Sequence, residues 1–117
     1  MVIILCELKV ISKDGEKERK VGEDIIYAKF SEDHILLKDV LGGTIKIHGA
    51  IIEEVDINSE TLKLASSPLI TKINKFLDAC NKCESKKAYD KEVEVLLEEI
   101  KASGDEAVRT LWKKYGR

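Results

Sequence analysis

The sequence predicts an α+β protein: a small SH3-like β barrel or bent antiparallel sheet, residues 1–65, followed by a two- to three-helix C-terminal extension, residues 66–117. Two observations predict this division. Up to Ala65, turn-forming residues recur about every eight to twelve positions, which favours short strands over helices. After Ser67-Pro68, apolar residues repeat at steps of three and four, the period of an α-helix.

Short runs rich in β-branched residues define the strands. The first run ends at Lys13-Asp14-Gly15-Glu16, where glycine after aspartate supplies the positive φ of a tight hairpin turn. At least five strands, and no helix longer than a turn or two, are therefore predicted before Ser66. The strands after the first are expected over residues 18–21, 25–30, 35–38, 44–47, 51–57 and 61–65.

The helical part begins with a recognisable start signal. Ser67 is a good N-cap, and Pro68 fits the first helical position, where its missing N–H is not needed. A second helix is expected over residues 90–103, with Gly104 ending it and Asp105 capping a third. The first helix carries one apolar stripe, made of Leu69, Ile73, Phe76, Cys80 and Cys83. The later helices carry Val93, Leu96, Leu97, Ile100, Val108, Leu111, Trp112 and Tyr115.

Charge is abundant but nearly balanced. Charged residues make up 36% of the 117-residue chain, with a net charge of −2, which does not favour a polyanionic partner. The two halves differ in sign, however. Residues 1–65 hold nine Lys and Arg against 13 Asp and Glu, whereas residues 66–117 hold 11 against nine. Any contact with a polyanion is therefore expected in the second half.

Cysteine usage and hydropathy indicate a soluble protein of the cytoplasm. The three cysteines are few and odd in number, as expected of reduced thiols. The N-terminal apolar run is only six residues long and lacks a preceding basic segment, so no export signal is predicted. No stretch approaches the roughly 20 apolar residues that a membrane-spanning helix needs.

The block from Cys6 to Ala65 has a distinctive order. One cysteine opens the first strand, a Lys-Asp-Gly-Glu turn follows, and a series of short strands comes after it. This order resembles the CooT-like family of very small β proteins, whose founding member is a nickel-binding accessory protein of carbon monoxide dehydrogenase. The later turns that mark the block are Gly22, Gly42-Gly43, Gly49 and Asn58-Ser59.

The resemblance implies a metal-binding accessory protein, with nickel as the metal, Cys6 as its ligand and a client metalloenzyme as partner. Relatives form homodimers in which two such cysteines approach one another. In the family the cysteine directly follows the initiator methionine, whereas here residues 2–5 intervene, so Cys6 keeps its thiolate but lacks a neighbouring terminal amine. A thiolate suits nickel, copper or zinc. The alternative is a cysteine buried as a small hydrophobic residue.

Two histidines and a CxxC pair are weaker metal candidates. His48 is a possible second ligand, because a neutral imidazole binds nickel or zinc. His34 and His48 are 14 residues apart, which is no known ligand spacing, so water-facing strand residues are the favoured alternative. Cys80 and Cys83 lie late in a predicted helix and on its apolar stripe. Core packing is therefore favoured over a redox or zinc role.

No catalytic residues are predicted. The sequence has no Gly-x-Ser-x-Gly motif and no phosphate-binding glycine loop. Glu53 and Glu54 are adjacent on a strand, so their side chains point to opposite faces and cannot form a carboxylate pair. We therefore expect that the protein is not an enzyme.

An RNA-binding or protein-interaction module is the alternative function. Members of the resembled family have also been labelled predicted RNA-binding proteins. The C-terminal helix combines aromatic and basic side chains, which suit stacking and phosphate contacts, although basic residues near a helix C-terminus also suit the helix dipole. The residues are Arg109, Trp112, Lys113, Lys114, Tyr115 and Arg117.

A homodimer is the expected assembly. The predicted helices carry more large apolar side chains than short helices can leave in water, and the small barrel cannot cover them all. Packing against a twofold mate is the commonest solution. It would also bring two copies of Cys6 into one assembly.

Overall fold

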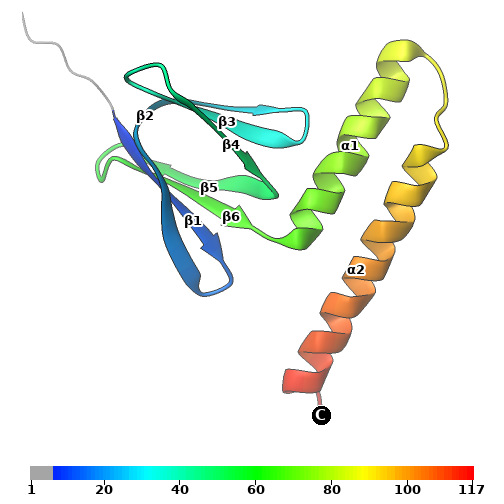
Figure 1. Ribbon diagram of the computed structural model, residues 1–117. Helices are drawn as coiled ribbons and strands as arrows, with labels where there is room; N and C mark the ends of the chain where they lie inside the picture. The colour runs from blue at the N-terminus through cyan, green and yellow to red at the C-terminus, as the bar shows by residue number, and fades with distance from the viewer. Residues whose placement is uncertain (1–6) are drawn as a thin grey trace, which may run out of the picture.

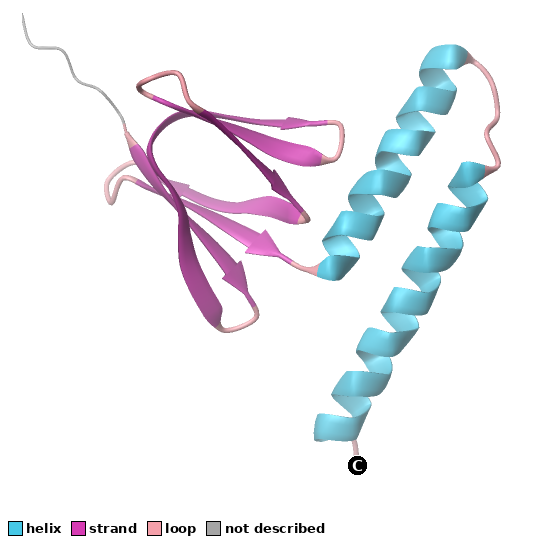
Figure 2. Cartoon of the chain, in the orientation of Figure 1, coloured by secondary structure: helices cyan, strands magenta, loops and turns pink. Residues whose placement is uncertain are grey.

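The computed structural model describes residues 7–117, and within this range it contains six strands followed by two helices (Figure 1). The predicted α+β class is confirmed, with a curled sheet first and helices after it (Figure 2). The strands are β1 Leu8–Asp14, β2 Lys17–Ser31, β3 His34–Asp39, β4 Thr44–His48, β5 Ala50–Asp56 and β6 Thr61–Ser66. The helices are α1 Pro68–Lys86 and α2 Glu92–Tyr115.

The six strands form one sheet in the order β4-β3-β2-β1-β6-β5. The sheet curls into a half-barrel rather than closing, because β4 and β5 remain its two edges. Four of the five strand pairs are antiparallel, and β1 and β6 pair in parallel from Lys9 with Thr61 to Lys13 with Ala65. This pairing joins the two ends of the β segment, which is why short-range hairpin signals did not predict it.

The second and third predicted strands are one strand. β2 runs without a break through Gly22 and bends there, with Asp24 at a positive φ of 56°. Register shifts lie on both sides of the bend, in the β1–β2 and β2–β3 ladders. Such bulges bend a strand without ending it. One long strand can therefore pair with β1 through its first half and with β3 through its second.

The core lies inside the curl of the sheet. Alternating residues of the paired strands fill it, as expected when successive side chains point to opposite faces. Partly buried Leu8, Val21, Ile45 and Ile47 pack against its margin. The fully buried members of the core are Val10, Ile25, Ile35, Leu37, Ala50, Leu62 and Leu64.

Helix α1 starts as predicted. The Ser67 hydroxyl accepts a hydrogen bond from the Leu69 N–H at 3.2 Å, and Pro68 occupies the first turn. The helix ends at Lys87, which has the left-handed φ of 53° and donates its N–H to the carbonyls of Cys83 and Glu84. The helix therefore ends within the polar segment that follows Cys83.

The predicted break at Gly104 was wrong, because α2 continues through it to Tyr115. Gly104 has no positive φ, and the space around it would admit a Cβ. An interior glycine costs a helix only about 1 kcal/mol relative to alanine. Without a proline or a left-handed residue to stop it, the helix continues. The extension therefore has two helices.

The two helices form an antiparallel hairpin beside the sheet, with α1 lying between the sheet and α2 (Figure 1). The described chain measures 56 × 47 × 18 Å and has a radius of gyration of 17.6 Å. A compact domain of this length would have a radius of gyration of about 13 Å. The hairpin thus projects from the sheet instead of folding over it. Many apolar side chains remain exposed as a result, among them Leu111 and Trp112.

Candidate metal centre

Cys6, the metal ligand implied by the family resemblance, lies outside the described residues, which begin at Glu7. The first strand that the structure describes starts two positions after it, at Leu8. The other sequence-predicted ligand, His48, is the last residue of β4 and is exposed.

The structure brings His48 against His34. The two residues are direct partners in the antiparallel β3–β4 ladder, and their ring centroids lie 5.4 Å apart. Both rings project from the outer face of the sheet, because the neighbouring Ile35 and Leu37 point into the core. The separation of 14 residues in the sequence matched no known ligand spacing and did not indicate this pair. A signal was nevertheless available, since folding residues 34–48 into a hairpin about Gly42-Gly43 places the two histidines opposite one another.

Asp33 completes the cluster from the turn between β2 and β3. Its Oδ1 lies 3.3 Å from His34 Nδ1 and 3.9 Å from His48 Nε2. Glu32, the preceding residue, takes a left-handed φ of 56°, which reverses the chain within two residues. One carboxylate oxygen therefore sits close to a nitrogen of each imidazole. Asp33 could not be predicted from the sequence, because its position beside the histidines depends on this turn.

The three side chains differ in exposure. His34 is 9% exposed, the Asp33 side chain 30% and the His48 side chain 57%. The cluster thus has a buried side, formed by His34, and an open side, formed by His48. Among the residues that the structure describes, these three are the group of His, Cys, Asp and Glu side chains whose ligand atoms all lie within 4.8 Å of one another.

Helix α1 passes close to this end of the sheet. The β2–β3 turn points toward the helix in Figure 1, and Thr71 abuts Gly49, the residue after His48. Further along α1, Lys82 forms a 2.9 Å ion pair with Asp78. The hydrogen bond and charge of Asp78 raise the pKa of Lys82, and the carboxylates of the β2–β3 turn add to that effect. The β2–β3 turn therefore lies near enough to α1 for the charges of Glu32 and Asp33 to act on Lys82.

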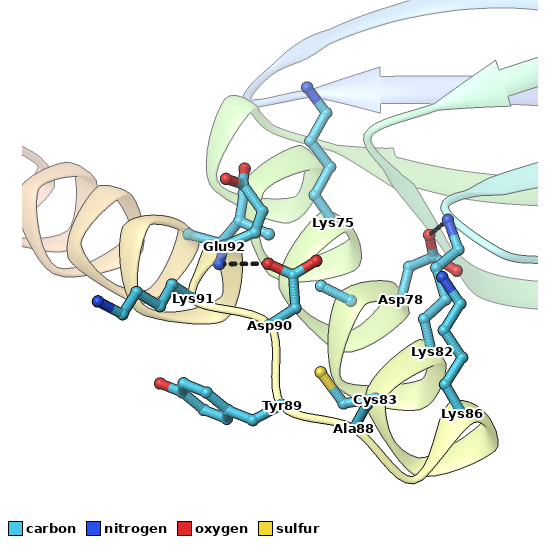
Figure 3. Close-up of a pocket in the computed structure, with 12 residues that line it drawn as sticks. Lys75, Asp78, Lys82, Cys83, Lys86, Ala88, Tyr89, Asp90, Lys91 and Glu92 are labelled. Atoms are coloured by element: carbon cyan, nitrogen blue, oxygen red, sulfur yellow. Dashed lines mark hydrogen bonds and ion pairs between the residues drawn. The ribbon is translucent and has the colours of Figure 1, made fainter.

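Cys80 and Cys83 remain separate from this centre. Both are half-buried free thiols on α1. Cys83 and Tyr89 line a cavity of about 580 Å³ at the closed end of the helical hairpin (Figure 3). Leu96 of α2 lines it as well. Most of its other lining residues carry charge, of both signs: Lys75, Asp78, Lys82, Lys86, Asp90, Lys91 and Glu92.

The basic and aromatic residues of the alternative RNA site all lie at the free end of α2 or just beyond it. Trp112 is 58% exposed and Tyr115 is 75% exposed, and the Trp112 ring lies against Gly116. The four basic residues of the set, Arg109, Lys113, Lys114 and Arg117, are also exposed. They form no ion pair with the sheet within residues 7–117; Arg109 pairs only with Glu106, at 3.9 Å.

Neither described helix is long and apolar enough to span a membrane.

The class defined by this fold is a very small curled β protein with an added helical hairpin. Residues 5–64 match the family described as CO dehydrogenase accessory protein CooT. The chain belongs to the CooT family, and the described function of that family is an accessory one. The helices lie beyond the matched residues.

A crystal structure described as a CooT from Carboxydothermus hydrogenoformans is also similar, with 21% sequence identity and a TM-score of 0.49. The similarity covers 53% of this chain and 98% of that one. No curated protein matches the chain.

Proposed function

We propose that this protein is a metal-binding accessory protein that binds nickel through Cys6 and serves the maturation of a metalloenzyme such as carbon monoxide dehydrogenase. The observation that carries the proposal is the family match, which begins one residue before Cys6 and ends at Leu64. In this role the nickel ion is cargo, and the protein is not itself an enzyme. The partner is the client metalloenzyme.

The chemistry of Cys6 supports this role. A thiolate is a soft ligand that favours late transition metals over the abundant hard cations. One thiolate does not complete the coordination of such an ion, so Cys6 needs further ligands. A second thiolate from another copy of the chain, or an imidazole such as that of His48, would serve.

We propose a homodimer as the working assembly. The elongated shape and the exposed apolar side chains of α2 support it, because a twofold mate would bury them. The exposed apolar residues on the last turns of α2 are Val108, Leu111, Trp112 and Tyr115. In this proposal residues 1–65 are the metal-binding domain and residues 66–117 an added helical domain.

A nickel titration of the untagged chain tests the role of Cys6. We expect stoichiometric nickel binding that Cys6→Ser weakens by at least about tenfold. The matched control is Cys83→Ser, which removes a thiol from the helical hairpin and leaves Cys6 in place. Equal nickel affinity for the wild type and Cys6→Ser would show that the family chemistry has not carried over.

Light scattering in the same samples tests the dimer, because it gives the mass of the particle in solution. A mass equal to that of a single chain at micromolar concentration would contradict the dimer.

The alternative function is an RNA-binding or protein-interaction module at the end of α2, favoured by the exposure of Trp112 and Tyr115 beside basic residues. RNA binding through this end would be salt-dependent and would survive Cys6→Ser. It would weaken on Trp112→Ala, because stacking contributes about 1–3 kcal/mol per base. The control for Trp112→Ala is Leu41→Ala, which removes an exposed apolar side chain from the β3–β4 turn.

A further inference from the structure

We propose that Asp33, His34 and His48 form a binding site for a divalent transition metal, of the zinc, nickel or copper class, that operates without Cys6. The site consists of two imidazoles from paired strands and one carboxylate from the adjacent turn. It goes beyond the proposed function, in which Cys6 is the principal ligand. It would give each chain a metal site of its own, with no contribution from a second copy.

The distances suit a single ion after rotation of the exposed His48 side chain. In a tetrahedral zinc site, ligand atoms that lie about 2.0–2.2 Å from the ion are about 3.4 Å from one another. The carboxylate–imidazole separations of 3.3 Å and 3.9 Å are close to that value. The ligand atoms of the three residues all lie within 4.8 Å of one another, so the widest pair needs to close by at most about 1.4 Å. Rotation of the exposed His48 side chain can supply this.

The backbone positions the ligands before any ion arrives. His34 and His48 are held opposite one another by the ladder that continues through Ile35–Ile47 and Leu36–Lys46. His34 is buried, and its ring nitrogen lies within hydrogen-bond reach of Asp33. Little side-chain freedom is therefore lost at His34 on binding, which favours affinity.

The donor set selects the class of ion. Imidazole nitrogen suits zinc, nickel and copper, whereas magnesium and calcium favour sites built from oxygen ligands alone. Asp33 supplies one negative charge to balance the ion. The open side at His48 leaves coordination positions for water or for a transfer partner, as in sites with three protein ligands. An ion held this way can pass to a transfer partner that binds at these open positions.

The charges around the cluster are compatible with a cation. Glu32 adds a carboxylate next to Asp33 in the turn. Lys82 of α1 is the cation whose pKa responds to both of these carboxylates, and its charge is already paired with Asp78 at 2.9 Å. The β2–β3 turn thus contributes more negative charge than α1 contributes unpaired positive charge.

The test is a zinc and nickel titration of the full, untagged chain carrying Cys6→Ser, followed by calorimetry and by the histidine NMR signals. We expect one ion per chain, and because the chain has only two histidines, both ring signals should shift together. Adding His48→Ala should weaken binding at least about tenfold. His48 is exposed, so this change should leave the melting curve unaltered. Asp33→Asn should weaken binding as well.

Lys46→Ala is the matched control, because Lys46 is exposed, belongs to the same strand and points to the same face as His48. It should leave the affinity unchanged. The proposal is overturned if the Cys6→Ser chain binds no zinc or nickel, or if His48→Ala does not alter its affinity. Retained binding by Cys6→Ser with loss on His48→Ala supports this site, whatever Cys6 contributes in the wild type. Loss on Cys6→Ser alone supports only the cysteine site.

Discussion

His34 and His48 face one another across the β3–β4 ladder, with ring centroids 5.4 Å apart and planes inclined at 43°. The relationship depends on strand register, because slipping one strand by a single residue would send its histidine to the other face of the sheet. The candidate metal centre and the hydrophobic core therefore both require this register between β3 and β4. The same register places Ile35 opposite Ile47 on the core side.

This register can be checked without any metal. We predict a nuclear Overhauser effect between the ring protons of His34 and His48 in the metal-free chain, since their rings are in near contact. His48→Gln should abolish the cross-peak, and Lys46→Ala should preserve it. A contact between either histidine ring and the Leu37 or Leu64 methyl groups would instead mean that the ladder is shifted and the site does not exist.

Leu96 should be the main anchor of the helical hairpin. It is the buried residue of α2, at 8% exposure, whereas its neighbour Val95 is 52% exposed. Leu96→Ala should destabilise the hairpin by about 2–4 kcal/mol through lost burial and a residual cavity. Val95→Ala should change it by less than about 0.5 kcal/mol. Helical circular dichroism and the fluorescence of the single tryptophan, Trp112, report the unfolding of α2. Equal effects of the two changes would contradict this packing.

Replacing Lys87 by glycine should stabilise helix α1. Lys87 adopts a left-handed φ of 53° at the helix end, a conformation that glycine adopts without the Cβ penalty. We expect Lys87→Gly to raise stability by about 0.5–1 kcal/mol, measured by thermal unfolding. Lys86→Gly, one residue earlier and within the helix, should have the opposite sign. A loss of stability on Lys87→Gly would show that the chain leaves α1 by another route.

Asp56 should titrate below the usual aspartate range. Hydrogen bonds from Ser59, first from its side chain and then from its backbone N–H, lower the pKa of Asp56 below 3.8, with the Asn58 N–H contributing less. Because this pKa is lower in the folded chain than in the unfolded chain, the turn stabilises the fold above about pH 4. That contribution is lost as the pH falls through the folded value.

Carbon-detected NMR titration measures the Asp56 carboxyl directly. Ser59→Ala removes the largest cause of the shift, so the pKa of Asp56 should rise toward 3.8. Asn58→Ala keeps its backbone N–H and should leave the value nearly unchanged. A wild-type Asp56 that titrates at or above 3.8 would contradict the hydrogen bonding in the β5–β6 turn.

Local chemistry in the sequence accounts for much of the fold. Gly15 was expected to form a hairpin turn and has a φ of 64°, and Ser67-Pro68 was expected to begin a helix and does so. Each of these depends on residues within one turn of the chain, so sequence position alone was enough. The same holds for the class of the protein, because turn spacing and helical period are both local patterns.

The local sequence did not predict how far the single elements β2 and α2 extend. The bend at Gly22 and the glycine at position 104 both resemble breaks in the sequence, yet β2 and α2 continue through them. Whether a glycine ends an element depends on the free energy of the contacts on either side of it. Those contacts come from β1, β3 and α1, which the local sequence does not contain.

The sequence by itself determined the α+β class, the place where strands give way to helices and the presence of Cys6 at the head of a CooT-like block. Only the tertiary structure decided the parallel pairing of β1 with β6 and the meeting of Asp33, His34 and His48. The physical reason is the range of the interactions. Turns and caps depend on neighbouring residues, whereas a ligand cluster depends on strand register and on a turn that directs a carboxylate back onto its own strand.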